Sequence, residues 1–177
     1  MRLRFRLLMV FIASFFRTRL SLDDENILSL RVLPNDVDVS LVSADRYLAL
    51  MDLGRINIVL RAGMFGTLVA NRWAPVVRVA AVRYRYPLKL FQKYQLRTRV
   101  VYWDHEWAWT EHVFERHGRI TAVGLTKTMF KSRDGLVPIT KFIAASGQSP
   151  VPPALPEAIA RLQTVEDLLR ERQAESA

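Results

Sequence analysis

Two aspartates, and the short polar segment that follows them, are the residues of this sequence best suited to chemistry. Asp36 and Asp38 lie one residue apart at the end of a pattern that predicts a strand over residues 28–38, so they are expected to share one face. A helical pattern begins a few residues later, which places Asp38 beside a helix N-terminus. A carboxylate there can act as base or nucleophile, provided that it faces an apolar slot.

The helix predicted over residues 44–61 would present the other groups of this site. Ser43 is suited to its N-cap, and Asp45 is favourable in its first turn. Backbone N–H groups around Ser43, Ala44 and Asp45 could then stabilise an oxyanion. The alternative is structural: each aspartate before the helix could cap it, face solvent or pair with an arginine.

The rest of the central part reads as antiparallel strands. Strand-like segments cover residues 75–86, 93–103, 106–116 and 119–131. Turns near Asp104–His105 and at His117–Gly118 would join neighbouring strands as hairpins. The helix over 44–61 is apolar nearly all round, which predicts burial, and Gly63 and Gly66 would end it. An α+β fold is therefore expected, with a curled sheet wrapped around a long central helix.

The two ends of the chain differ in composition from the centre. We expect a basic apolar helix over residues 1–22, a main domain over 23–147, and a proline-rich linker with a final helix over 148–177. In residues 1–20, arginines flank an apolar run about half as long as the ~20 residues that a spanning helix needs. This segment could lie on anionic lipid as a peripheral membrane contact, or pack on its own domain or dimer partner.

Composition narrows the chemistry further. The 177 residues include no cysteine, which excludes disulfides and thiolate sites, and the three histidines lack metal-ligand spacing. We expect neither a metal nor a cofactor. The net charge of +9 favours anionic partners such as lipid head groups or the phosphates of coenzyme A. Arginines interleaved with tyrosines over residues 78–99 could be a solvated sheet edge or meet such phosphates, and nucleic acid ranks a distant third.

An ordered set of segments resembles the hotdog-fold thioesterases of the thioesterase-like superfamily. The similar segments are residues 35–55, 73–77, 83–88, 91–98, 103–104, 111–116 and 133–135. This resemblance covers roughly residues 25 to 140. It implies a hotdog fold with helical extensions at both ends, a homodimer, and an acyl site at the dimer interface.

The resemblance also implies an activity, the hydrolysis of an acyl thioester carried by coenzyme A or acyl carrier protein. Asp38 would be the base or nucleophile. Candidate substrate-contacting residues are Tyr47, Arg83, Arg85, Trp109 and Glu111. Asp52 corresponds to a position usually acidic in relatives, which suggests a structural ion pair with Arg55 or Arg46.

The resemblance is incomplete at the loop that carries Asp38. Relatives commonly have Asp-x-Asn-x-His-x-Asn-Asn-x-x-Tyr, whereas this chain has Val42 at or near the histidine position and lacks both asparagines. A non-catalytic acyl- or lipid-binding protein is therefore the alternative function. We expect a cytoplasmic location, with a peripheral position on the inner face of a membrane as the second possibility.

Overall fold

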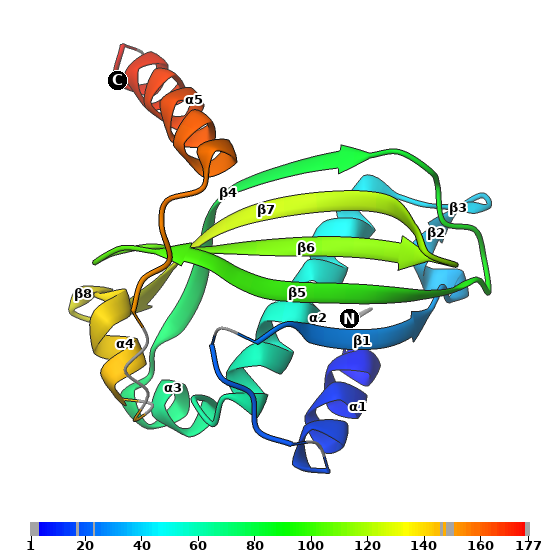
Figure 1. Ribbon diagram of the computed structural model, residues 1–177, viewed down its shortest axis with the longest axis horizontal. Coiled ribbons are helices and arrows are strands. Elements are labelled where there is room, and N and C mark those ends of the chain that lie inside the picture. Colours follow the sequence, from blue (N-terminus) through cyan, green and yellow to red (C-terminus); the bar gives the residue numbers. More distant parts are fainter. Residues whose placement is uncertain (1–3, 17, 23, 146, 148–150, 176–177) are drawn as a thin grey trace.

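The computed structural model describes residues 4–16, 18–22, 24–145, 147 and 151–175. A curled sheet surrounds one long helix, and shorter helices cover the open side (Figure 1). The helices are α1 (Arg4–Phe15), α2 (Ala44–Arg61), α3 (Phe65–Asn71), α4 (Ile139–Ala145) and α5 (Glu157–Ala174). The strands of the main sheet are β1 (Asn26–Arg31), β4 (Ala74–Tyr84), β5 (Lys93–Trp103), β6 (Ala108–Arg116), β7 (Arg119–Ser132) and β8 (Gly135–Val137). A small hairpin consists of β2 (Val37–Asp38) and β3 (Leu41–Val42).

The main sheet is antiparallel throughout, in the order β1-β5-β6-β7-β4, with β8 paired to β7. Its first and last strands in this order flank α2 in the sequence, so the sheet curls around that helix. This is the hotdog fold, and the expected α+β class is confirmed. The long strand β4 forms one edge of the sheet, and β1 forms the other.

Close packing of α2 against the sheet depends on two glycines. A Cβ built on Gly54 would overlap the hydroxyl of Thr98 on β5, and one on Gly124 of β7 would overlap the side chain of Met51. The backbones can therefore approach more closely than larger residues would allow. Leu50, Met51 and Leu53 of the same helix are almost fully buried in the resulting core.

The expected strands and hairpins match the structure well in the second half of the domain. The alternation over 93–103 corresponds to β5, and residues 117 and 118, both with positive φ, form the turn between β6 and β7. Oδ1 of Asp104 accepts hydrogen bonds from the N–H groups of Glu106 and Trp107 at 2.8 and 2.7 Å, which stabilises the turn between β5 and β6.

The first expected strand is too long. It ends at Arg31, and Pro34 then begins a short 3-10 helix that includes Asp36. Asp38 follows in the separate hairpin strand β2, so the two aspartates do not share a strand face. The helices α3 and α4 were not expected, and Gly66 lies inside α3 instead of after a helix end.

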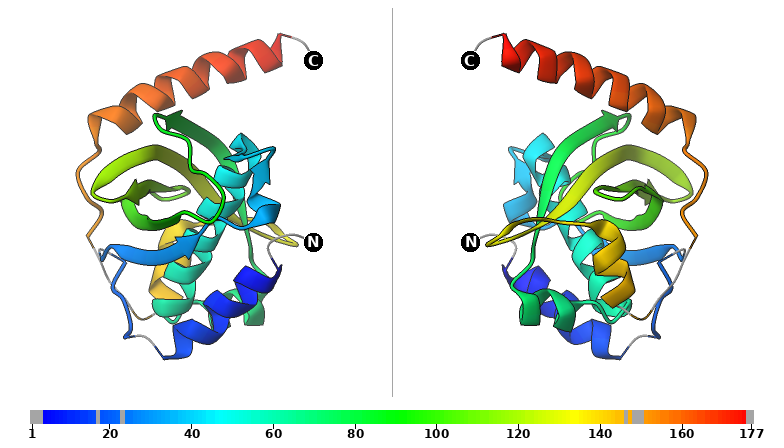
Figure 2. Two further views of the ribbon diagram at one scale, coloured as in Figure 1. Left: turned by 90° about the vertical axis from the view of Figure 1, so that its right-hand side faces the viewer. Right: turned by 90° about the vertical axis from the view of Figure 1, so that its left-hand side faces the viewer.

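The terminal helices lie on opposite sides of the molecule (Figure 2). On the open side, α1 packs against α2. On the outer face of the sheet, α5 buries Ile159 and holds Lys127 of β7 through Glu166, with an Nζ to Oε2 distance of 2.6 Å. Three other apolar residues of α5, Val165, Leu168 and Leu169, are exposed.

Candidate functional site

Asp36 is a buried structural residue in this fold. Its Oδ2 accepts a hydrogen bond from Nη2 of Arg6 at 2.5 Å and another from the N–H of Leu33 at 2.8 Å. Arg6 belongs to α1 and is itself buried, so the ion pair connects the N-terminal helix to the segment before the hairpin. This guanidinium is consequently not available to lipid, contrary to the expectation for the arginines of residues 1–20.

Asp38 lies on the exposed side of the β2–β3 hairpin. Val39, with a φ of +59°, turns the chain immediately after it. The hairpin is tied to the loop between β4 and β5, because the N–H of Val42 donates to the carbonyl of Leu88 at 2.9 Å. The exposed position of Asp38 differs from the expectation that it faces an apolar slot.

Helix α2 begins at the expected residue, Ala44, with Ser43 at the N-cap position. The hydroxyl of Ser43 bonds the carboxylate of Asp45, and this bond, together with the nearby charge of Arg46, lowers the pKa of Asp45. The N–H groups of Arg46 and Tyr47 donate to the carbonyl of Ser43 at 3.0 and 3.3 Å. The first turn thus uses these two donors internally, and Ala44 begins the helix beside the exposed Asp45.

The expected substrate-contacting residues do not come together. Tyr47 is part of the core, where burial raises the pKa of its phenol and its ring packs against Phe114 at 4.9 Å between centroids. Glu111 pairs with Arg99 at 2.8 Å on the outer face of the sheet. Trp109 is buried on that same face, near Lys127. Arg83 and Arg85 are exposed at the end of β4 and just beyond it.

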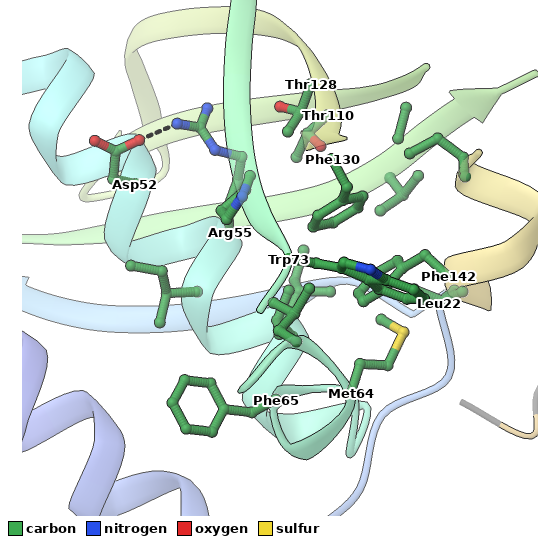
Figure 3. A pocket seen from close by; sticks show the side chains of 18 of the residues that line it. Leu22, Asp52, Arg55, Met64, Phe65, Trp73, Thr110, Thr128, Phe130 and Phe142 are labelled. Atoms are coloured by element: carbon green, nitrogen blue, oxygen red, sulfur yellow. Dashed lines mark hydrogen bonds and ion pairs between the residues drawn. The ribbon is translucent and has the colours of Figure 1, made fainter. Parts of the chain in front are cut away.

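A large apolar cavity lies elsewhere, on the open side of α2 (Figure 3). Its volume is about 900 Å³, within the ~300–1,000 Å³ of typical small-molecule sites. Side chains from α1, α2, α3, α4 and the strands β4 to β7 line it. They include Leu7, Leu8, Phe11, Ile56, Val59, Met64, Phe65, Leu68, Val69, Trp73, Val77, Val100, Trp103, Ala108, Phe130, Ile139 and Phe142.

Among the few charged groups that line this cavity, Asp52 and Arg55 of α2 form an ion pair (Figure 3). An ion pair of Asp52 with Arg55 or Arg46 was expected, and the partner is Arg55, whereas Arg46 pairs with Asp45. The Asp52 side chain is 56% exposed, whereas the Arg55 side chain is mostly buried. Desolvation lowers the pKa of Arg55, and the Asp52 carboxylate opposes that shift. Asp52 therefore places a carboxylate on the wall of the cavity, which neither Asp36 nor Asp38 does.

His112 of β6 lies in the core, between Thr98 of β5 and Thr126 of β7, and is not among the residues that line the cavity. It is fully buried, and its ring nitrogens lie 3.4 Å from the hydroxyl of Thr98 and 3.1 Å from that of Thr126. Burial, and then the charge of Arg55, lowers the pKa of His112 well below its usual value. The ring is consequently neutral at pH 7 and is held as a polar part of the core. No group of three or more His, Cys, Asp or Glu suited to a metal occurs within the described residues.

Sequence and fold comparisons agree on the class of protein. The fold is that of the hotdog proteins, and the profile of the thioesterase-like superfamily matches residues 32–161. The chain therefore belongs to the thioesterase-like superfamily. This membership supports thioester hydrolysis as the general class of activity.

Individual relatives are more distant. The protein THEM6 of Danio rerio is 34% identical over 106 residues, which cover 58% of this chain and 52% of that protein. The chain spans about half the length of the curated relatives it matches. Among solved structures, a DHNA-CoA thioesterase of Staphylococcus aureus has a TM-score of 0.63 at 12% identity, covering 81% of this chain and 93% of that one. A putative oleoyl thioesterase of Lactobacillus plantarum has a TM-score of 0.66 at 13% identity, covering 76% and 55%.

Proposed function

We propose that this protein hydrolyses acyl thioesters of coenzyme A or acyl carrier protein and holds the acyl group in the cavity beside α2. The observation that carries the proposal is the position of Asp52 in the lining of a mostly apolar cavity, where it is the one carboxylate among the described residues. A mostly apolar cavity with one carboxylate suits a substrate with a hydrocarbon part and one reactive polar bond. Membership of the thioesterase-like superfamily supports the same class of reaction.

The structure favours Asp52 over Asp38 as the general base. Arg55 contacts Oδ1 of Asp52, so Oδ2 can hold the attacking water. The carboxylate would take a proton from that water while the oxygen attacks the carbonyl carbon. The thiolate would then leave and take up a proton. Asp38 remains the candidate from the family resemblance, at an exposed position outside the residues that line the cavity.

Two matched variants separate these assignments. Asp52→Asn keeps the shape of the side chain but removes the base, so thiol release from acyl-CoA should fall about 10²–10⁴-fold. Asp38→Asn should leave the rate within about twofold. The opposite pattern would return the role to Asp38. If neither variant changes the rate, the role of a carboxylate base is rejected.

Acyl or lipid binding without hydrolysis is the second candidate function. The ion pair between Asp52 and Arg55 favours it, because the pair engages one oxygen of this carboxylate in a structural contact. The expected loop histidine and asparagines are also missing from the sequence. Binding of acyl-CoA without any release of free thiol would select this function.

A homodimer formed along β4 is part of the proposal. The long edge strand β4 has exposed Val76 and Val77, and an apolar unpaired edge is suited to pairing with another strand. Pro75 and Val77 also line the cavity, so a second copy at this edge would lie close to its opening. Light scattering of the purified protein measures the oligomeric state directly.

The proposal also includes a cytoplasmic location with peripheral contact to a membrane. The outer side of α1 exposes large apolar residues, among them Phe5, Met9 and Ile12. Such a helix face can insert into a lipid surface, and the exposed Arg19 could meet anionic head groups. Within the described ranges, no single helix is both long and apolar enough to cross a bilayer.

A further inference from the structure

The cavity has a closed end and an open end, which the exposure of its lining residues distinguishes. Trp103, Phe130, Ile139 and Phe142 are each at least 95% buried and form what we call the floor. At the opposite end, Leu8, Phe65, Val69 and Val77 are between 39% and 60% exposed and form what we call the mouth. A ligand therefore enters past α1, α3 and β4 and extends inward toward α4.

Among the described residues, two of the three charged residues that line the cavity are exposed, namely Asp52 and Arg72 at the end of α3. The third, Arg55, is mostly buried and paired with Asp52. The floor has only hydrocarbon side chains apart from one indole N–H. A bound molecule would therefore keep its polar head near the mouth and its apolar part at the floor.

The cavity wall is not wholly apolar, because Thr110 and Thr128 also line it and both are buried. The hydroxyl of Thr128 has no hydrogen-bond partner, so a polar group of a ligand at its level can bond it. The floor residues themselves offer only one indole N–H, and a hydroxyl carried to them would lose its hydrogen bonds to water. Each buried methylene, by contrast, strengthens binding about fourfold, so the floor itself favours plain hydrocarbon.

The cavity has room for a long hydrocarbon chain. A methylene occupies roughly the volume of a liquid water molecule, about 30 Å³, so a twelve-carbon chain fills about 360 Å³. This is well under half of the volume of about 900 Å³. Short acyl groups would leave the floor empty, whereas a long chain reaches it.

We propose that the substrate class is long-chain, unsubstituted aliphatic acyl thioesters of at least about twelve carbons, and that Ala108 sets the limit on chain length. The proposal rests on the proposed function in taking the ligand to be an acyl thioester. Ala108 is a small residue on the cavity wall, paired in register with Trp103 of the floor. A larger side chain at this position would occupy the space that the end of the acyl chain needs.

Binding of S-alkyl coenzyme A thioethers tests the proposal independently of hydrolysis, because these analogues cannot be cleaved. With chains of 4, 8, 12 and 16 carbons below their micelle concentrations, affinity should rise about fourfold per carbon up to at least twelve carbons. A hydroxybenzyl analogue, which places no hydrocarbon chain on the floor, should bind more weakly than the twelve-carbon chain. A flat series, or tightest binding of the hydroxybenzyl analogue, would overturn the proposal.

Two alanine variants then test the floor itself. Ala108→Phe should weaken binding of the sixteen-carbon analogue at least tenfold and leave the eight-carbon analogue within about twofold. Ala158→Phe, at an exposed position on α5 away from the cavity, should change neither. Equal weakening of both lengths by Ala108→Phe would contradict a limit on chain length, and unchanged eight-carbon binding verifies that the variant is folded.

Thiol release from the matching acyl-CoA series is measured separately. Length-dependent binding without thiol release would reject hydrolysis and keep the assignment of the ligand. Thiol release that is fastest for short or aromatic acyl groups would reject the chain-length assignment and keep hydrolysis.

Discussion

The buried ion pair between Arg6 and Asp36 makes a sharp prediction about stability. The side chains are only 9% and 7% exposed, so solvent screens their interaction weakly. Replacing Arg6 by methionine would leave the Asp36 carboxylate buried with only the N–H of Leu33 as partner. Removing one member of a buried pair typically costs about 3–5 kcal/mol, whereas surface pairs are worth about 0–1 kcal/mol.

In a protein of this length, a loss of that size lowers the melting temperature by roughly 6–20 °C. Thermal and urea unfolding of Arg6→Met measure the loss. The double variant Arg6→Met with Asp36→Asn removes both charges and should recover most of it, since no unpaired charge then remains. A cost below about 1 kcal/mol for Arg6→Met would refute the view that this pair anchors α1, as would a double variant less stable than the single one.

Two further predictions concern the core. Gly54→Ala should lower the free energy of unfolding by about 1–2 kcal/mol, because the new Cβ meets the hydroxyl of Thr98. Gly66→Ala should be neutral or stabilising, because Gly66 has open space around it in α3. Urea unfolding of the two variants distinguishes these outcomes. His112 should make stability fall as pH drops below about 6.5, because the unfolded ring takes up a proton that the buried ring, with its lowered pKa, does not. The contribution of His112 to this loss of stability is at most about 1.4 kcal/mol per pH unit. The free energy of unfolding of His112→Gln should therefore depend less on pH between 7 and 5 than that of the original protein, and two parallel stability–pH curves would contradict the prediction.

The sheet could be predicted from the sequence because its signals are local. The alternation of β5 and the His117–Gly118 turn depend only on residues adjacent in the chain. The prediction that Asp36 and Asp38 share one strand face was wrong, because Pro34 interrupts the strand pattern and begins a 3-10 helix. A proline within such a pattern was the signal that could have corrected it.

The cavity could not be predicted in the same way, because its walls come from distant segments. Leu8 of α1, Phe65 of α3 and Phe142 of α4 approach one another only after folding. The family resemblance implied an ion pair of Asp52 with Arg55 or Arg46, and the structure has the pair with Arg55, three residues along the same helix. Its position at a ligand cavity depends on α3 and α4, neither of which was expected.

Helix α1 contributes no part of the sheet around α2, but it completes the wall of the cavity. A version that starts at residue 24 would still contain every strand of the sheet and the whole of α2. It would nevertheless lack Leu7, Leu8 and Phe11 from the cavity, and Asp36 would lose its guanidinium. Trimming this protein to its recognisable domain would therefore preserve its outline while removing one side of the chamber.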